Sequence, residues 1–349
     1  MSMSASQRVP VAIVGANGYS GEELCSILAR HPGVHVVAIT SRQHAGKHAG
    51  SVLPRLTGVG DFSKLLFIEP AIETLLDCGA EVYFLALPHG LAAEFALPLW
   101  KAGKRIVDLS ADFRLRDAAR YSEFYGGAHP APELLSEAVY GLPELHREEI
   151  RGAMVVGSAG CYPTSILLPL VPLLLQGLII PEEIVVSSAS GVSGAGRKAE
   201  TALLFGECNE SLRAYGLPKH RHLSEIEQEL SLAAGKEVMI TFTPHLAPMS
   251  RGIHSTIFVR PSAGVSPEAI LPTLLAAYSE EPFVRVSESL PDTKHTTGTN
   301  FCDISVRIDC RTGRVILLSA EDNLVKGAAG QAVQNFNLMA GLPETTGLI

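Results

Sequence analysis

The feature that most constrains the fold is an apolar strand that runs directly into a glycine-rich turn and then into a helical pattern. The strand covers residues 9–14, the turn reads Gly-Ala-Asn-Gly-Tyr-Ser-Gly over 15–21, and apolar Leu24, Ile27 and Leu28 follow with helical spacing. A strand, glycine turn and helix in this order are typical of a parallel sheet whose first helix holds a pyrophosphate on its N-terminal amides. The spacing is G-x-x-G-x-x-G rather than the commoner G-x-G-x-x-G, so a tight turn without a ligand is the alternative. The candidate dinucleotide contacts are Gly15, Asn17, Gly18, Tyr19, Ser20 and Gly21.

The next strand indicates which dinucleotide binds. Residues 34–40 are apolar and end in Thr40-Ser41-Arg42, with Lys47 just beyond. A site for NAD usually has an aspartate or glutamate here, which binds the ribose hydroxyls. A hydroxyl and a guanidinium suit a 2′-phosphate instead, so we expect NADP with Ser41 and Arg42 among its contacts. A solvated loop is the alternative for Arg42.

Strands and helices continue to alternate, which favours a doubly wound α/β sheet of the Rossmann type. Ligands of such sheets collect at the carboxyl ends of the strands. His89 and Ser110 follow two of these strands and are candidate cofactor contacts, and Arg114 is a candidate substrate contact; capping and loop structure are the alternatives. Residues 117–143 are predicted to form an irregular surface excursion. The further predicted strands are 65–68, 81–87 and 105–109, with helices over 72–76 and up to about 101.

A second strand, turn and helix surround a cysteine. The turn Gly157-Ser158-Ala159-Gly160-Cys161-Tyr162-Pro163-Thr164 separates the apolar runs 153–156 and 166–175. Pro163 suits the first turn of a helix, which places Cys161 at the helix N-terminus. The partial positive charge there favours the thiolate and lowers the pKa of a cysteine. The alternative is a small buried cysteine, but the turn favours a nucleophile.

Composition limits the class of protein. The 349 residues are 46% hydrophobic and 18% charged, which fits a globular enzyme with two domains, and a net charge of −8 without a basic block argues against a nucleic-acid binder. Six scattered cysteines without a CxxC pair indicate neither a zinc site nor a disulfide framework, and we expect no metal. The first residues lack the apolar core of a signal peptide, and no run approaches the roughly 20 apolar residues of a membrane span. We therefore expect a cytoplasmic protein.

The second half predicts a different architecture. Strands over 184–190, 237–243, 252–260, 302–309 and 314–320 follow one another with one helix, near 267–280. Such a run indicates an α+β domain with a mostly antiparallel sheet. The glycine turn 191–197 ends in an arginine and suits an anionic group, or is a plain loop.

A histidine cluster precedes a predicted helix. Ser224 and Glu227 match the S-x-x-E capping box, so the helix is expected to start here. His220 and His222 then lie in the entering loop, where a histidine that titrates near neutrality suits general acid–base work. Glu225 is in position to orient a histidine. Two histidines alone are a weak metal signature, and a histidine bonded to backbone is the structural alternative.

The C-terminal stretch 322–339 contains many small residues and is predicted to end in a helix that returns to the nucleotide domain. We expect a dinucleotide-binding domain over 1–157 and 322–349, and a catalytic and dimerisation domain over 158–321.

Taken together, these motifs resemble those of N-acetyl-gamma-glutamyl-phosphate reductase, the NADPH enzyme family of arginine biosynthesis. The resemblance spans nearly the whole chain and implies a Cys161 nucleophile, a His220 acid–base group with Glu225 as its partner, and His222 as the reserve choice. The family often has proline where Ser224 stands. The related aspartate-semialdehyde dehydrogenases share the architecture, but their cysteine is not typically followed by Tyr-Pro-Thr. The motifs are GANGYSG (15–21), LPHG (87–90), DLSADFR (108–114), GSAGCYPT (157–164), SGAGR (193–197), HRHLSEIEQ (220–228) and DNLVKGAAGQA (322–332).

The implied reaction starts when the thiolate attacks an acyl phosphate and releases inorganic phosphate, which leaves a thioester. NADPH reduces the thioester to an aldehyde, with Asn323 near the nicotinamide. A homo-oligomer, dimer or tetramer, is expected, without nucleic-acid or membrane partners. A carrier-linked acyl phosphate, a Cys–His hydrolase and a non-catalytic dinucleotide sensor are the alternatives. The expected substrate contacts are Arg114, Ser158, Gly194, Arg197, Lys198, His222 and Arg251.

Overall fold

The computed structural model describes residues 8–349. Residues 1–7, part of the stretch in which no signal peptide is expected, lie outside the described residues. The chain divides into two compact units: unit 1 contains the described residues through Ala159 together with Ala328–Ile349, and unit 2 is Gly160–Gly327. No helix among residues 8–349 is both long and apolar enough to cross a membrane.

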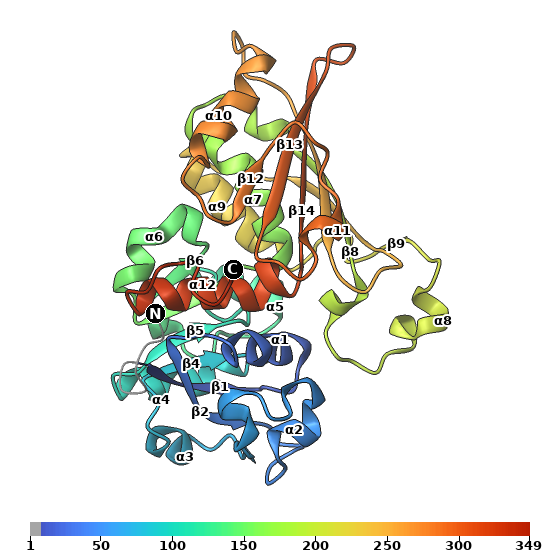
Figure 1. Cartoon of the computed structure of the whole chain (residues 1–349). Helices are drawn as coiled ribbons and strands as arrows, with labels where there is room; N and C mark the ends of the chain where they lie inside the picture. The colour runs from blue at the N-terminus through green and yellow to red at the C-terminus, as the bar shows by residue number, and fades with distance from the viewer. Residues whose placement is uncertain (1–7) are drawn as a thin grey trace. The chain divides into compact units, whose positions relative to one another are not determined.

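Unit 1 is built on a seven-stranded sheet in which every neighbouring pair is parallel. This arrangement confirms the expected doubly wound sheet (Figure 1). The strands, in sheet order, are β3 (Phe67–Ile68), β2 (Val34–Thr40), β1 (Val9–Val14), β4 (Val82–Leu85), β5 (Arg105–Asp108), β7 (Val155–Ser158) and β6 (Ala138–Gly141). The helices are α1 (Tyr19–Leu28), α2 (Ala49–Val52), α3 (Ile72–Asp77), α4 (Ala92–Lys101), α5 (Ala118–Tyr125), α6 (Pro143–Gly152) and α12 (Gly330–Met339).

The sheet of unit 1 is largely buried on both faces because most positions of its strands are apolar, with exceptions such as the exposed His35 of β2. Successive side chains of a strand point to opposite faces. Val11 and Ile13 of β1 therefore pack in one core cluster with α1 and α12, whereas Ala12 and Val14 pack in another with α3 and α4. Residues of α12 follow the rest of unit 1 by more than 150 positions in the chain, yet they complete its core.

The prediction of a surface excursion over 117–143 is wrong. Ala138–Gly141 forms the edge strand β6, which pairs in parallel with β7. Tyr121, Ala131 and Leu134 are buried as well, and the last two pack against the α3–α4 face of the sheet. The glycines and prolines of this stretch hide its apolar pattern, because they break the spacing that marks a helix or strand.

Unit 2 is built on a mixed seven-stranded sheet, antiparallel except for the pairs β12–β13 and β8–β10, as expected from the run of strands. The second predicted strand is shifted, since the strand expected over 237–243 is found at Thr241–Leu246. The strands, in sheet order, are β12 (Val284–Val286), β13 (Cys302–Asp309), β14 (Arg314–Glu321), β11 (Ile253–Val259), β8 (Val185–Ser190), β10 (Thr241–Leu246) and β9 (Arg213–Ala214). The helices are α7 (Cys161–Leu175), α8 (Phe205–Cys208), α9 (Leu223–Ala234), α10 (Ile270–Ala277) and α11 (Thr293–Thr296).

Helix α7 lies in the interior of unit 2, between the sheet and the helices α9 and α10. Pro169 and Pro172 lie inside this helix and have no N–H to donate, so the carbonyls of Ser165 and Leu168, four residues earlier, lose their helical partners. The hydroxyl of Ser319 on β14 donates to the Ser165 carbonyl at 2.6 Å, and the hydroxyl of Tyr278 donates to the Leu168 carbonyl. Each proline is therefore matched by a side-chain donor from another element, which holds α7 against the sheet.

Candidate active site

The glycine-rich turn after β1 needs two of its glycines for packing. Gly15 has a φ of +88°, and a Cβ there would lie 2.5 Å from the carbonyl oxygen of Ala86 at the end of β4. A Cβ on Gly21 would lie 2.5 Å from the carbonyl oxygen of Gly15, where α1 leaves the turn. The Gly15 N–H donates to the hydroxyl of Thr40 at 3.2 Å, which ties the turn to β2. Larger residues at 15 and 21 would separate these elements.

The third glycine of the turn, Gly18, is not required for packing. A Cβ on Gly18 would meet nothing within 4 Å, and its φ of −76° is open to any residue. Gly18 is the N-cap of α1, and no side chain caps this helix. The first turn of a helix has N–H groups without intrahelical partners. The space beside Gly18 therefore fits a pyrophosphate on the start of α1, with Asn17, Gly18 and Ser20 half-buried and Tyr19 exposed beside it.

At the end of β2 the predicted phosphate-binding side chains differ in exposure. Thr40 is buried and its hydroxyl is used by the glycine turn, and Ser41 is also buried. Arg42 is exposed and makes no side-chain hydrogen bond or ion pair with the described residues. The guanidinium of Arg42 is therefore the group at this strand end that is available to a 2′-phosphate.

The strand end of β5 is a network of carboxylates. Asp108 accepts hydrogen bonds from the N–H of Ser110 at 2.9 Å and from its hydroxyl at 2.8 Å. Asp112 accepts from the N–H of Gly90 at 2.7 Å and of Ala93 at 3.1 Å, which fixes the loop before α4. Burial, and next the charge of Asp112, raises the pKa of Asp108 to about 7. The Ser110 hydroxyl thus donates to Asp108 and holds the loop after β5, as in the alternative of a loop-stabilising role. Its contact with a cofactor stays a prediction. His89, in the same loop, is exposed and its ring centroid lies 5.4 Å from that of Tyr125.

Arg114 and Ser158 meet at the end of β7. The Nε of Arg114 donates to the carbonyl oxygen of Ser158 at 2.7 Å, and an NH2 group donates to the carbonyl oxygen of Leu109 at 3.1 Å. The Ser158 hydroxyl accepts from the amide of Asn335 on α12 at 3.2 Å. These bonds hold a buried arginine at the strand ends of unit 1, and its contact with an anion stays a prediction.

In unit 2, Cys161 is the first residue of α7, as the turn predicts, and it is half-buried. Gly160 is the N-cap in an extended conformation with φ −71° and ψ 160°, and no side chain caps the helix. The start of this long helix therefore presents backbone N–H groups and a partial positive charge around the sulfur, which favour an anion.

The carboxylate of Glu225 contacts both Gly160, the residue before Cys161, and the imidazole of His222. The carboxylate is fully buried on α9, where its Oε2 accepts from the N–H of Gly160 at 3.1 Å. Its Oε1 lies 3.8 Å from Nε2 of His222. A single carboxylate thus fixes the backbone next to the sulfur and lies beside an imidazole, and the histidine in its reach is His222.

The capping box predicted for α9 is wrong. His222 is the N-cap, without a side-chain cap bond, and the hydroxyl of Ser224 donates backwards to the carbonyl of Arg221 at 2.7 Å. Glu227 instead accepts from the N–H of Ile240 at 3.3 Å. The helix begins one residue before Ser224, so its serine lies inside the first turn and bonds to the preceding loop.

His220 is held as a neutral donor. Its Nδ1 accepts the backbone N–H of His222 at 3.1 Å, which leaves the proton of the neutral ring on Nε2. Burial lowers the pKa of His220 to about 4, and the charge of Arg221 adds to this effect. The ring lies edge-on to Tyr162, with centroids 5.5 Å apart.

Two tyrosines beside Cys161 were missed by the sequence reasoning. The hydroxyl of Tyr215 donates to that of Tyr162 at 2.9 Å. Partial desolvation raises the pKa of Tyr215 to about 12, the hydrogen bond that it donates to Tyr162 opposes the shift, and the charge of Cys161 adds to it. Both phenols therefore stay protonated near the sulfur. Only the position of Tyr162 directly after the cysteine could have indicated a role, because Tyr215 lies in a short strand region without a motif.

The remaining candidates surround the loop after β8. The side-chain amide of Asn323 accepts from the N–H of Gly252 at 2.8 Å and donates to the hydroxyl of Ser193 at 2.9 Å. These two hydrogen bonds hold the loop after β8 in place. An NH1 group of Arg251 lies 3.3 Å from the buried carboxylate of Asp322.

The loop itself is open to solvent. Gly194, Arg197 and Lys198 are exposed, and the ammonium of Lys198 lies 3.8 Å from Glu200. A Cβ on Gly194 would lie 2.8 Å from the hydroxyl of Ser190, so the loop packs closely on the end of β8. The structure thus gathers Cys161, both histidines and Glu225 in one cluster, with these anion-binding candidates in a neighbouring loop.

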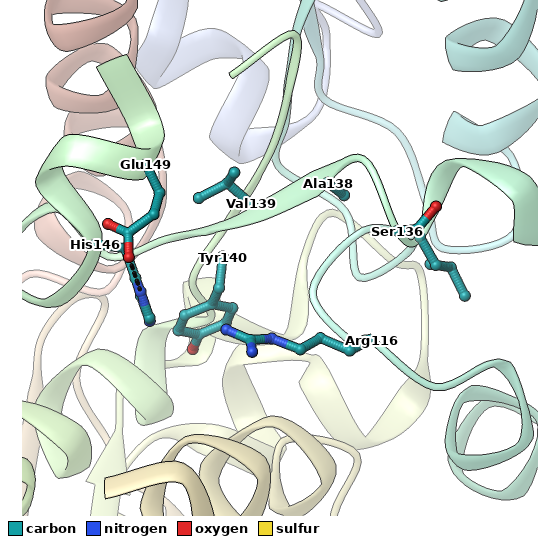
Figure 2. Close-up of a pocket in the computed structure, with 8 residues that line it drawn as sticks. Arg116, Ser136, Ala138, Val139, Tyr140, His146 and Glu149 are labelled. Carbon is teal, nitrogen blue, oxygen red and sulfur yellow. Dashed lines mark ion pairs between the residues drawn. The ribbon is translucent and has the colours of Figure 1, made fainter. Parts of the chain in front are cut away.

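Unit 1 also contains a pocket that is lined by other residues (Figure 2). Figure 2 shows His146 and Glu149 on one wall, where the imidazole lies 3.9 Å from the carboxylate, and Arg116 across the ring of Tyr140. None of the predicted catalytic, cofactor or substrate residues lines it. Within residues 8–349, no three histidine, cysteine or acidic side chains converge on a metal position. The lining residues are Arg116, Leu135, Ser136, Ala138, Val139, Tyr140, His146 and Glu149.

Two family models match the two halves of the chain. Residues 10–153 match the model described as semialdehyde dehydrogenase, NAD binding domain. Residues 161–323 match the model described as semialdehyde dehydrogenase, dimerisation domain. The boundary between the two matches falls at the turn before Cys161.

Curated relatives are similar over nearly the full length. The chain is 56% identical to an N-acetyl-gamma-glutamyl-phosphate reductase of Akkermansia muciniphila, over 98% of this chain and 99% of that protein. It is 52% identical to an N-acetyl-gamma-glutamyl-phosphate reductase of Citrifermentans bemidjiense, over 97% of this chain and 98% of that one. Among solved structures, aspartate semialdehyde dehydrogenase II from Vibrio cholerae shares the fold with a TM-score of 0.72 and 18% identity, covering 96% of this chain and 99% of that chain.

Proposed function

The chain belongs to the N-acetyl-gamma-glutamyl-phosphate reductases, and we propose that it performs their reaction through a thioester on Cys161. The enzyme is an oxidoreductase that uses NADPH to reduce N-acetyl-gamma-glutamyl phosphate to N-acetyl-glutamate 5-semialdehyde in arginine biosynthesis. The observation that carries the mechanism is a half-buried cysteine on the uncapped N-terminus of α7, with a buried carboxylate on the N–H of the preceding residue.

In the first step the Cys161 thiolate attacks the acyl carbon, a C–S bond forms, and the bond from that carbon to the phosphate oxygen breaks. The departing phosphate takes up one proton and leaves as hydrogenphosphate. We assign the supply of this proton to His222, whose Nε2 lies 3.8 Å from the carboxylate of Glu225, the group that also binds the N–H of Gly160. His220 contributes a hydrogen bond from its Nε2–H to the substrate oxygen, since its Nδ1 is occupied.

In the second step the first N–H groups of α7 stabilise the negative charge that develops on the carbonyl oxygen. When bound, NADPH supplies the hydride that reduces the thioester. The C–S bond then breaks, the aldehyde leaves, and Cys161 regains its thiolate at the helix N-terminus. The helix end thus favours the sulfur anion both as the attacking and as the leaving group.

We assign the contacts of the cofactor and of the substrate to the residues described above. The start of α1 beside Gly18 would hold the pyrophosphate and Arg42 the 2′-phosphate, so NADP(H) fits the residues of unit 1. Ser41, His89, Ser110 and Asn323 complete the proposed cofactor contacts. The proposed contacts to the phosphate and carboxylates of the substrate are Arg114, Ser158, Gly194, Arg197, Lys198 and Arg251.

The match of residues 161–323 to a dimerisation domain supports assembly of the chain into a homo-oligomer. We also place the enzyme in the cytoplasm, where six free cysteines stay reduced. Light scattering of the purified protein tests the first point, and a monomer mass at micromolar concentration would contradict it.

The reverse reaction tests the mechanism. Incubation with NADP⁺, phosphate and N-acetyl-glutamate 5-semialdehyde should raise the absorbance of NADPH. Cys161→Ala should lower this rate by about 10³-fold or more, since covalent catalysis is lost. Cys310→Ala is the matched control, because Cys310 is exposed and remote from the cluster, and it should retain the wild-type rate. Turnover that persists in Cys161→Ala would exclude the thioester, and faster turnover of aspartate semialdehyde or of a carrier-linked semialdehyde would reassign the substrate.

A further inference from the structure

We infer that Gly327 is a positioning residue, whose missing side chain allows the turn after β14 to pack directly on the backbone of Cys161. The inference rests on the proposed role of Cys161 as the nucleophile. A Cβ at position 327 would lie 2.6 Å from the Cβ of Cys161 and 3.1 Å from its Cα. Real Cβ atoms do not approach other atoms within 3 Å, so the two residues must move apart if either gains an atom here.

Hydrogen bonds hold the turn that carries Gly327 in place. It is a π-helical turn over Val325–Ala329, a form that often marks a functional site. The Gly327 N–H donates to the carbonyl oxygen of Asp322 at 2.9 Å. The carboxylate of Asp322 is fully buried and accepts from the N–H of Leu324 at 2.8 Å and of Gly298 at 2.7 Å. These bonds anchor the start of the turn to unit 2.

A second group, the carboxylate of Glu321, also lies close to the space that a side chain at position 327 would need. The Oε1 of Glu321, which is fully buried, would lie 3.0 Å from a Cβ at position 327. A methyl group on this turn therefore displaces Cys161, the carboxylate of Glu321, or both. On the other flank of Cys161, Glu225 holds the N–H of Gly160. The cysteine is thus placed between two contacts that set the direction of its Cα–Cβ bond.

A change in that direction affects the reaction more than binding. A nucleophile displaced by about 1 Å loses its approach to the acyl carbon, which lowers rates by up to about 100-fold. Gly327→Ala should therefore lower kcat by about 10- to 100-fold, with KM values for NADPH and the acyl phosphate within about 2-fold of wild type. The rate of alkylation of Cys161 by iodoacetamide, followed by mass spectrometry of its peptide across pH 5–9, should change in parallel.

Gly60→Ala is the matched control. A Cβ on Gly60, whose φ is +47°, would lie 2.9 Å from the backbone carbonyl oxygen of Ala29, so a rigid neighbour crowds this position too, in unit 1 rather than at Cys161. This variant should lose thermal stability without a change in kcat or in the alkylation profile of Cys161. If Gly327→Ala behaves in the same way, with lower stability and unchanged kcat and alkylation, the glycine is merely structural and the inference is wrong.

A double-mutant cycle on thermal stability tests the contact between residues 161 and 327 without any assay of activity. In Cys161→Gly the atom nearest to position 327 is absent, so adding Gly327→Ala should lower the melting temperature less than it does in the Cys161 background. An equal loss in both backgrounds would refute the contact. Loss of turnover in Cys161→Ala tests the proposed function separately: if that variant remains active, the function fails while the stability coupling between 161 and 327 still stands.

Discussion

Replacement of Ser319 by alanine should destabilise unit 2 through a single carbonyl of α7. The Ser319 hydroxyl donates at 2.6 Å to the Ser165 carbonyl, whose helical partner would be the N–H that Pro169 lacks. Both serines are fully buried, so water cannot replace the lost donor. A buried carbonyl left without a partner costs about 1–3 kcal/mol. For a domain of this size, 2 kcal/mol lowers the melting temperature by about 4–8 °C.

Circular dichroism at 222 nm, followed during thermal and urea unfolding, measures this loss. Ser305→Ala is the matched control, because its hydroxyl is also fully buried in the same sheet but makes no hydrogen bond within residues 8–349. The same substitution at position 305 should be neutral or stabilising, since it removes a buried polar group without a partner.

The decisive comparison uses Pro169→Ala. An alanine at 169 restores the N–H that serves the Ser165 carbonyl in an ordinary helix. In this background, Ser319→Ala should cost less than about 0.5 kcal/mol, because the carbonyl keeps a partner. If Ser319→Ala costs the same with proline or alanine at 169, the hydroxyl stabilises α7 in some other way and the reasoning is refuted.

Three further predictions concern the cofactor and the histidines. Arg42→Asp should raise KM for NADPH by about 10-fold or more and improve the use of NADH, since the 2′-phosphate loses its cation; unchanged steady-state preference would place the phosphate elsewhere. Gly18→Ala should fold normally yet bind NADPH more weakly in a titration, whereas Gly15→Ala should fold poorly because its φ is +88° and its Cβ would collide with Ala86; equal behaviour of the two would contradict this. The pKa of His220 is about 4 in the fold and 6.5 in the unfolded chain, so between these values the unfolded chain binds the extra proton and stability falls as pH is lowered. The free energy of unfolding from urea titrations should fall in this window by up to about 3 kcal/mol less for His220→Gln than for the wild type, and an unchanged pH dependence would refute the low pKa.

The local patterns predicted much of the fold and the position of the nucleophile. The strands Val9–Val14 and Val34–Thr40 are found at the expected residues, and Cys161 begins its helix, because strand, turn and helix signals lie within a few residues of one another. The error over residues 117–143 has the opposite cause, since that stretch is ordered by contacts with the rest of unit 1 rather than by its own pattern.

Contacts between distant residues could not be predicted in this way. The approach of Gly327 to Cys161 joins positions far apart in the chain, and the only local signal was a run of small residues. The pairing of Glu225 with Gly160 and His222 likewise depends on how α9 packs against α7. A motif indicated which residue types gather around the sulfur, but only the packing of the two helices assigns their partners.

The division of unit 1 into two stretches has a consequence for the order in which the protein is made. Helix α12 supplies Val333 and Phe336 to the core of unit 1, both fully buried, and the ribosome synthesises it only after Gly160–Gly327. Until then one face of the sheet of unit 1 has only part of its cover, from α1 and its neighbours, while Gly160–Gly327 is already complete as a continuous segment. During translation Gly160–Gly327 is therefore able to fold before the core of unit 1 is complete, and part of the N-terminal sheet stays exposed to aggregation or chaperones until α12 emerges.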